Sequence, residues 1–343
     1  MKNTFLIIVL FATILSCTKE APKDYAVISG TITNPIDSLK IRLYDAKNNK
    51  TVMVKVNTDG SFRDTLKLEK PVTYTVAYKS FFSLYLENDM NLNINLDTES
   101  FAKSIAFSGK GEVENNFLRF KAKKANELYG EDYKVFLGLN EADFNAKTNT
   151  FINGVKNELE AKKTVLDTAF INKQTRDLEV FEKQNLAQYT EQQKINKALA
   201  KGNPSPEFND YVNYRGGTSS LKDYRGSYVY IDVWATWCGP CKYEIPFLEK
   251  LEKEYHNKNI KFVSLSIDNK EDEQKWRDMI KEKNMSGIQL LADNDYNSKF
   301  VQDYFIYGIP RFIVIDTKGN IVNYDAPRPS EEKLKTLLNS LPL

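Results

Sequence analysis

The chain has 343 residues, more than one typical domain needs, and 41% of them are hydrophobic, so two or three units with cores of their own are expected. Its 48 basic and 46 acidic residues are mixed along the chain and leave a net charge of +2, which excludes the broad positive field of a nucleic-acid-binding protein. Three cysteines are too few for a framework of structural disulfides, and with one histidine the chain offers one CxxC but no second ligand pair for a zinc site.

The first residues are typical of an export signal. Lys2 precedes an apolar run, from Phe5 to Leu15, that is too short to span a bilayer as a stable helix, and Ser16-Cys17 follows directly. This ending resembles the lipobox of bacterial lipoproteins, although Leu15 is bulkier than the residue usual at its place.

The lipobox resemblance implies that residues 1–16 are a cleaved signal peptide, that Cys17 carries lipid, and that residues 17–23 form a tether. In that family a residue such as Thr18, rather than Asp, after the lipidated cysteine is compatible with transfer to the outer membrane. We therefore expect a lipid-anchored protein of the bacterial cell envelope that faces the periplasm. An uncleaved membrane anchor and plain secretion remain alternatives.

Residues 24–108 alternate between apolar and polar side chains with the period of a β-strand. Turn signals such as Asn34-Pro35, Asp59-Gly60 and Asn88-Asp89 separate seven or eight short segments rich in Val, Ile, Thr, Tyr and Phe. The pattern predicts a small antiparallel β-sandwich or barrel. The segment has no histidine cluster, carboxylate pair or glycine loop that would carry chemistry, so we expect a supporting, docking or spacer role.

Residues 109–202 change to the period of a helix. Phe151, Val155 and Leu159 recur every fourth residue, and Asp167 can cap a further helix. The apolar stripe predicted for that second helix consists of Ile171, Gln174, Leu178, Phe181 and Leu186. Gly202 and two prolines then end the helical pattern, which places a domain boundary before residue 203.

Residues 203–343 alternate strands with helices, which predicts an α/β domain with helices on both faces of its sheet. The predicted strands cover 226–236, 260–268 and 288–293 and a terminal hairpin at 307–324, and the predicted helices cover 241–256, 272–284, 297–305 and 331–340.

The stretch WATWCGPCKYEIP, residues 234–246, holds Cys238 and Cys241. The chain offers no second cysteine pair, and His256 ends a charged helix where it is expected to face solvent, so no metal site is predicted. An inert disulfide would close too small a loop to constrain the unfolded chain much. A redox pair explains more, because a helix that begins near Cys238 favours its thiolate. Cys238 would be the exposed nucleophile, and Cys241, one turn on and more buried, would resolve the mixed disulfide.

This stretch resembles the thioredoxin signature, and the resemblance covers roughly residues 203–343. It implies that Asp232 is the buried acid that takes the proton of Cys241, that Pro246 kinks the active-site helix, and that Ile309-Pro310 is a cis peptide bond facing the sulfurs. The positions implied to contact the substrate are Trp237, Gly239, Pro240, Ile309, Pro310 and Arg311.

A closer resemblance is to the TlpA-like disulfide reductases of bacterial envelopes, in which a β-rich domain often precedes the thioredoxin domain. The pattern CxxCxxE places Glu244 where that group has an active-site glutamate. Asp232 could instead be a satisfied structural acid, and Glu244 a solvated helix residue. Arg311 departs from the small residue usual after the cis-proline and could lower a cysteine pKa, and Ser264 replaces the lysine that pairs with the buried acid in thioredoxin.

The sequence therefore predicts a thiol–disulfide oxidoreductase without a cofactor, acting as a reductase of protein disulfides and drawing electrons from a membrane donor. Two alternatives stay open. A peroxiredoxin-like peroxidase needs a threonine and a proline ahead of its cysteine, and here only Thr236 is present. A non-enzymatic surface binding module would use the β-rich segment to recognise a ligand.

Overall fold

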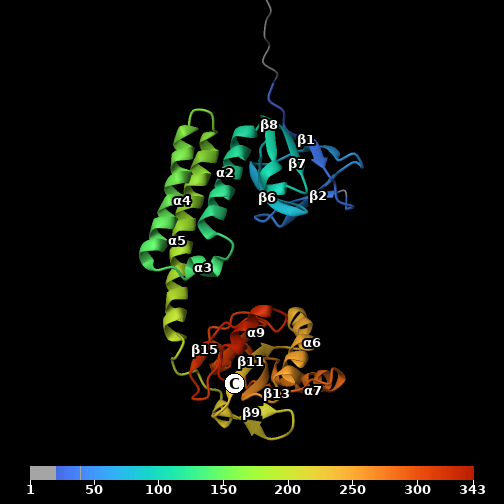
Figure 1. Ribbon diagram of the computed structural model, residues 1–343. Helices are drawn as coiled ribbons and strands as arrows, with labels where there is room; N and C mark the ends of the chain where they lie inside the picture. Colours follow the sequence, from blue (N-terminus) through green and yellow to red (C-terminus); the bar gives the residue numbers. More distant parts are fainter. Residues whose placement is uncertain (1–20, 39) are drawn as a thin grey trace, which may run out of the picture. The chain divides into compact units, whose positions relative to one another are not determined.

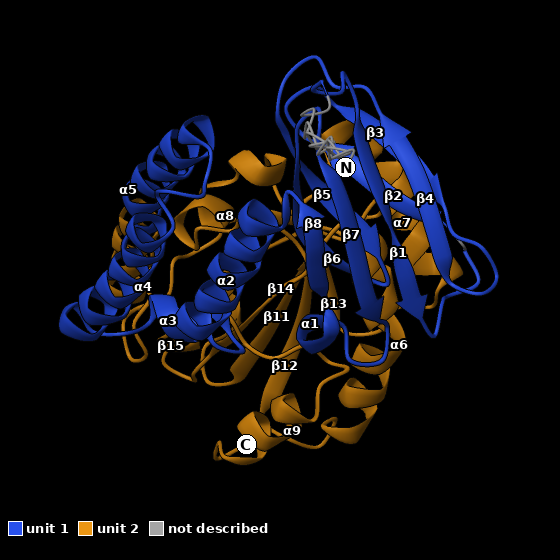
Figure 2. Ribbon diagram, turned by 90° about the horizontal axis from the view of Figure 1, so that it is seen from above, with its two compact units in different colours: residues 1–185 blue, residues 186–343 orange. Residues whose placement is uncertain are grey.

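In this computed structural model, residues 21–38 and 40–343 are described, and they form two compact units, which divide between Asn185 and Leu186 (Figures 1 and 2). Helix α5 (Thr168–Ala198) runs across this division. The lipobox cysteine, Cys17, lies outside the described residues. None of the described helices combines the length and apolarity that crossing a membrane requires.

The first unit begins with two four-stranded sheets. One has the order β4-β1-β7-β8, and the other β3-β2-β5-β6. Their strands are β1 (Ala26–Thr33), β2 (Lys40–Asp45), β3 (Lys50–Lys55), β4 (Ser61–Leu66), β5 (Val72–Tyr78), β6 (Ser80–Leu86), β7 (Asn91–Asp97) and β8 (Ala106–Lys110), with the short helix α1 (Phe101–Ser104) before β8. Ile28, Leu43 and Leu84 are among the buried side chains of the alternating pattern.

The predicted β-rich fold is present, with one pair that departs from the antiparallel rule. β1 and β7 run parallel, whereas β4 lies antiparallel to β1 on its other side. The chain passes through the second sheet between β4 and β7 and returns in the direction of β1, and such a crossover permits parallel pairing.

Three helices of the first unit lie side by side next to the strands (Figure 1). They are α2 (Glu112–Tyr129), α4 (Glu141–Ala161) and the first part of α5, and the short α3 (Tyr133–Leu137) connects α2 to α4. Phe151, Val155 and Leu159 are buried, as their spacing predicts. The carboxylate of Asp167 accepts hydrogen bonds from the N–H groups of Ala169 and Phe170 at 2.7 and 3.1 Å, which confirms the predicted cap.

The predicted stripe on α5 is wrong at its last position. Gln174 and Leu178 are buried, but Leu186 is 54% exposed. A helix turns by about 100° per residue, so a residue eight positions after Leu178 lies about 80° off its stripe, whereas Asn185, seven positions on, lies nearly in line. Asn185 is buried and donates to the hydroxyl of Thr148 at 3.2 Å.

The second unit is built on a seven-stranded sheet with the order β10-β9-β13-β12-β11-β14-β15. Its strands are β9 (Tyr211–Asn213), β10 (Thr218–Ser219), β11 (Tyr228–Trp234), β12 (Ile260–Ser266), β13 (Ile288–Leu291), β14 (Arg311–Ile315) and β15 (Ile321–Asn323). Its helices are α6 (Gly239–Glu254), α7 (Glu273–Glu282), α8 (Lys299–Asp303) and α9 (Glu332–Asn339), with 3-10 turns at Leu221–Tyr224, Lys270–Asp272 and Asp295–Asn297. The α/β prediction is confirmed, but β9 and β10 are too short for the pattern to have shown them.

Two apolar clusters cover the two faces of this sheet. On one face Tyr230 and Phe312 pack with Leu248 of α6 and Leu334 of α9. On the other, Ile231 of β11 belongs to the cluster that includes Trp276 of α7 and Phe300 of α8. The sheet is thus buried on both sides, which explains the continuous apolar run of β11.

The end of α5 belongs to the core of the second unit. Leu199, directly after the helix, is buried in the cluster of α7 and α8, and Ile195 packs against that cluster. The hydroxyl of Tyr324 donates to Asn196 Oδ1 at 2.8 Å. The helical pattern before the prolines therefore contributes to both units.

Candidate active site

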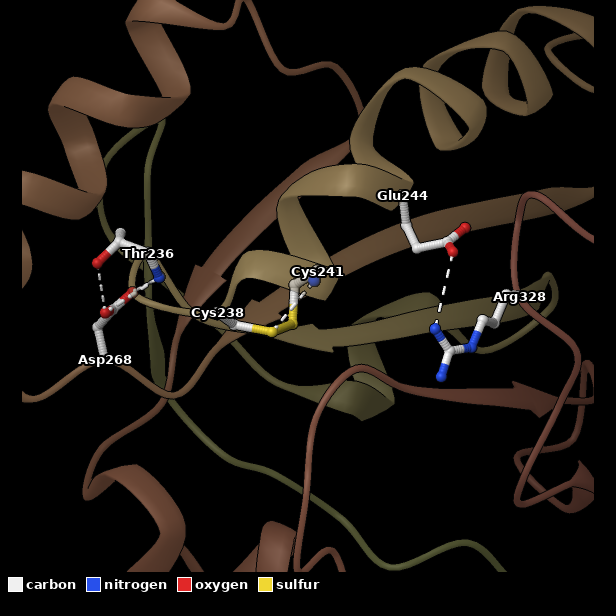
Figure 3. Close-up of a disulfide and its surroundings, with 6 residues drawn as sticks. All are labelled: Thr236, Cys238, Cys241, Glu244, Asp268 and Arg328. Carbon is white, nitrogen blue, oxygen red and sulfur yellow. Dashed lines mark hydrogen bonds and ion pairs between the residues drawn. A yellow bond between two sulfur atoms is a disulfide. The ribbon is translucent and has the colours of Figure 1, made fainter. Parts of the chain in front are cut away.

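The active-site cysteines lie where β11 gives way to α6. β11 ends at Trp234, and Cys238 is the N-cap residue of α6, which begins at Gly239. Cys238 and Cys241 form a disulfide, and Sγ of Cys238 accepts the N–H of Cys241 at 3.1 Å (Figure 3). On reduction, this N–H and the helix dipole favour a thiolate at Cys238.

Both sulfur-bearing residues are buried in this disulfide form. Cys238 is 4% exposed and Cys241 is 2% exposed, so the prediction that Cys238 is distinctly more exposed is wrong for this state. The reason is the position of Cys238 at the cap, where its Sγ is turned to the first turn of α6. Gly239 and Pro240 between the two cysteines are exposed.

The Ile309-Pro310 peptide bond is cis, as predicted. β14 begins at the next residue, Arg311, which pairs with Val233 on β11, so the cis-proline loop lies beside the end of the strand that leads to Cys238. Ile309 packs against the apolar cluster that contains both cysteines. This placement is compatible with the substrate contacts predicted for residues 309–311.

Exposed aromatic side chains come from the segments around the disulfide. Trp237, directly before Cys238, is 51% exposed and lies against Tyr296, with ring centroids 6.3 Å apart. Tyr243 of α6 and Tyr307 of the cis-proline loop are 64% and 75% exposed. Trp237 was predicted as a contact residue, but Tyr296 was not, because its distance from Trp237 in the sequence gives no sign of their contact.

Asp232 is fully enclosed on β11. Its Oδ1 accepts no hydrogen bond from any described residue, so it is not a satisfied structural acid. Its strand neighbours in register are Ser264 and Phe312, and neither supplies a cation. Burial, and secondly the negative charge of Glu244, raises the pKa of Asp232 to about 8. At neutral pH this carboxyl group therefore holds a proton and can exchange it.

Glu244 is buried one turn beyond Cys241 on α6, with 2% of its surface exposed, so the alternative of a solvated helix residue is wrong. The backbone N–H and the hydroxyl of Ser330 each donate to its carboxylate at 3.0 Å. The Arg328 guanidinium lies 4.0 Å from Oε1 (Figure 3). These contacts come from the segment before α9, which the sequence pattern did not connect with the active site.

Arg311 forms an ion pair with Asp325, with its Nη1 3.3 Å from a carboxylate oxygen. Its positive charge therefore has a partner, which weakens the argument that Arg311 lowers the pKa of a cysteine.

A second buried carboxylate holds the loop before Cys238 in place. The backbone N–H of Thr236 donates to Asp268 Oδ2 at 2.9 Å, and its hydroxyl donates to Oδ1 at 2.7 Å (Figure 3). Ser266 Oγ donates to Asp268 Oδ2 at 2.7 Å. Sequence reasoning missed Asp268. The available signal was an acidic residue directly after a buried strand that runs parallel to β11, since the ends of such strands meet at one edge.

Among residues 21–38 and 40–343, no group of three His, Cys, Asp or Glu side chains is placed to hold a metal ion. His256 is exposed and contacts the carbonyl of Lys253 at 3.1 Å.

Comparison with known proteins agrees with this geometry. Residues 200–341 match the family model described as Redoxin. The thiol-disulfide oxidoreductase ResA of Bacillus thuringiensis is 26% identical over 140 residues, which cover 41% of this chain and 78% of that protein. Residues 200–341 therefore form a domain that is similar to the thioredoxin-fold thiol–disulfide oxidoreductases.

Two solved structures from Bacteroides vulgatus match the same part of this chain. A candidate thiol-disulfide oxidoreductase is 37% identical and covers 41% of this chain and 96% of its own, with a TM-score of 0.38. The thioredoxin domain of a thiol-disulfide oxidoreductase is 28% identical and covers 42% of this chain and 99% of its own, with a TM-score of 0.38. These matches cover about two-fifths of the chain.

The burial of Asp232 makes the free energy of unfolding depend on pH. Because the pKa of Asp232 is about 8 in the folded protein and about 3.9 in an unfolded chain, folding binds a proton between these values. The stabilising contribution is complete below about pH 4 and is lost as the pH rises to 8, by about 1.4 kcal/mol per unit. We expect Asp232→Asn to remove this dependence, so that its stability relative to wild type rises with pH across this window. Urea denaturation at pH 5, 6, 7 and 8 measures it, with the exposed Asp278→Asn as control. Parallel curves for Asp232→Asn and wild type would contradict the assignment.

Proposed function

We propose that this protein is a disulfide reductase that acts on proteins of a bacterial cell envelope. The observation that carries the proposal is the Cys238–Cys241 pair at the start of α6, with Gly-Pro between the cysteines. Thioredoxin, which lies near the reducing end of the scale at about −270 mV, has the same dipeptide.

The reaction proceeds by two exchanges. The thiolate of Cys238 attacks one sulfur of the substrate disulfide, and the other substrate sulfur leaves with the electron pair. Asp232, once it has released its own proton, takes the proton of Cys241, and the Cys241 thiolate attacks Cys238 Sγ and releases the second substrate sulfur. The substrate is reduced by two electrons, and the enzyme is left in the disulfide form seen in the structure. A dithiol donor at the membrane must supply two electrons for the next cycle.

Protein substrates suit the surface around the cysteines. Trp237, Tyr243 and Tyr307 are large, exposed aromatic residues, a type enriched at protein interfaces. Gly239, Pro240 and the residues 309–311 complete the proposed contact surface. No cofactor takes part, because the two sulfurs carry the electrons themselves.

Neither alternative function gains support from a specific contact. The hydroxyl of Thr236 donates to Asp268 rather than being turned to Cys238, which does not favour a peroxidase site. Nothing in the β-sandwich identifies a ligand for a binding module.

The equilibrium reduction potential of the Cys238–Cys241 pair tests the direction of the reaction. We expect a value at or below about −250 mV in defined thiol buffers, close to thioredoxin. A value near about −120 mV, like that of the oxidant DsbA, would reverse the direction and make the chain a disulfide donor.

Substitution of the resolving cysteine tests the division of roles. Cys241→Ser should accumulate mixed disulfides with envelope proteins, because Cys238 still attacks but nothing releases the product. Non-reducing electrophoresis of cells that express the variant detects these adducts. Cys238→Ser is the matched control and should form none; adducts in equal amount on both variants would argue against Cys238 as the nucleophile.

The proposed location rests on the residues before the described part of the chain. With lipid on Cys17, the protein would be held at a membrane, most simply the outer membrane, and would face the periplasm. Cys17→Ser should move the protein from the membrane fraction to the soluble fraction, and labelling with a fatty-acid analogue should disappear. An unchanged distribution and label would refute lipid anchoring at this residue.

A further inference from the structure

Two buried carboxyl groups belong to the elements on either side of the cysteines, Asp232 to β11 and Glu244 to α6, and their surroundings differ. Oδ1 of Asp232 has no hydrogen-bond partner among the described residues. Glu244 is in contact only with donors, since Ser330 supplies an N–H and an O–H and Arg328 a guanidinium. A proton on Glu244 would weaken these contacts, because a neutral carboxyl group accepts hydrogen bonds less strongly than a carboxylate, whereas a proton on Asp232 Oδ1 disturbs no described contact of that atom.

We infer that Ser330 and Arg328 are positioning residues that keep Glu244 an acceptor and so leave Asp232 as the carboxyl group that exchanges the proton with Cys241. The inference deepens the proposed function and rests on it. It gives a role in the reaction to the segment before α9, which lies nearly ninety residues from the cysteines in the sequence.

The balance can be written for reduction of the disulfide by a small thiol. The incoming thiolate attacks Cys238 Sγ, the Sγ–Sγ bond breaks, and the electron pair passes to Cys241 Sγ. The proton of Asp232 then neutralises the Cys241 thiolate. Asp232 is left as a carboxylate, and Cys238 is joined to the small thiol in a mixed disulfide. The second thiolate of dithiothreitol then attacks the reagent's sulfur in that bond, so that Cys238 leaves as a thiolate and the reagent closes to its cyclic disulfide.

The charges around Asp232 come from several elements. α6 contributes Glu244 and Glu252, which both raise the pKa of Asp232. β11 contributes Tyr230, whose own pKa is raised well above its usual value by burial and then by Asp232. β12 and β14 place the uncharged Ser264 and Phe312 next to Asp232. The cation that the described residues place next to one of these acids is Arg328, and its contact is with Glu244.

Removal of the donors should make Glu244 a competitor for the proton. In a coupled pair, a greater proton affinity of one group raises the pH at which the last proton leaves, and it lowers the share of that proton on the other group. Variants that lack a donor from Ser330 or Arg328 should therefore show two changes together. The ionisation should occur at a higher pH, and proton transfer at pH values below that ionisation should be slower.

The experiment is stopped-flow reduction of the full-chain disulfide by dithiothreitol between pH 5 and 10, followed by tryptophan fluorescence and normalised to the thiolate concentration of the reagent. Wild type should show an inflection near pH 8, and Asp232→Asn should lack it. Ser330→Ala and Arg328→Gln should each move the inflection upward by at least about half a unit and slow the reaction at pH 7 by roughly tenfold.

Conservative variants distinguish a role of Ser330 and Arg328 in positioning Glu244 from a role in stabilising the fold. Ser330→Thr and Arg328→Lys keep the donor and the charge, and they should restore the profile of wild type. In the Asp232→Asn background, Ser330→Ala should have no further effect at pH 7. A uniform loss of rate at every pH, or the same loss with and without Asp232, would overturn the inference in favour of a purely structural role.

The failure of the inference and of the proposed function give different results. If the Cys238–Cys241 pair exchanged with neither oxidised nor reduced thioredoxin-type substrates, the proposed function itself would be refuted. If the pair exchanged normally and Ser330→Ala had the pH profile of wild type, only the positioning role of Ser330 and Arg328 would be refuted.

Discussion

The active site depends on one junction, at which a buried strand ends and a helix begins within five residues. β11 is held on both sides, by β12 and β14, and α6 starts at Gly239, so Cys238 is fixed at the cap. The N–H of Cys241 then points at Cys238 Sγ. The loop between β11 and α6 is held in place, because Asp268 accepts hydrogen bonds from both the backbone N–H and the hydroxyl of Thr236. The reactivity of the pair thus follows from backbone geometry before any neighbouring charge is considered.

The two cysteines differ because opposite electrostatic effects act on them. The start of α6 favours negative charge at Cys238. One turn beyond Cys241 on the same helix, the buried Glu244 disfavours another negative charge close to it, as its effect on the pKa of Asp232 illustrates. A thiolate that forms at Cys238 therefore persists, whereas one that forms at Cys241 must be neutralised or consumed. In the proposed reaction this asymmetry, rather than exposure, would separate the attacking from the resolving sulfur, since both residues are almost fully buried in the disulfide form.

The sequence predicted what local chemistry determines. The alternation of the first strands, the cap at Asp167 and the CxxC motif each depend on a few consecutive residues, and the structure has all of them. The cis bond before Pro310 is also present, but it was implied by the resemblance to thioredoxin and not by local chemistry. The contacts of Glu244 with Ser330 and of Thr236 with Asp268 join positions 86 and 32 residues apart, and no local pattern shows such pairs. The exposure of Leu186 was missed for a simpler reason, since a stripe must follow the angle of the helix and not merely its apolar residues.

Substrate selection and reaction rate are assigned to different parts of the site. With Cys238 only 4% exposed, the sulfur itself offers a partner very little surface. The exposed rings of Trp237, Tyr243 and Tyr307 offer far more, and aromatic burial is a large source of binding free energy. Changes among these rings should therefore alter which proteins dock, while the buried carboxyl groups act after docking. The rings are exposed, whereas Asp232 and Glu244 are buried, so substitutions among the rings are expected to change docking more than proton transfer. A thioredoxin-type site could in this way keep one chemistry while its clients change.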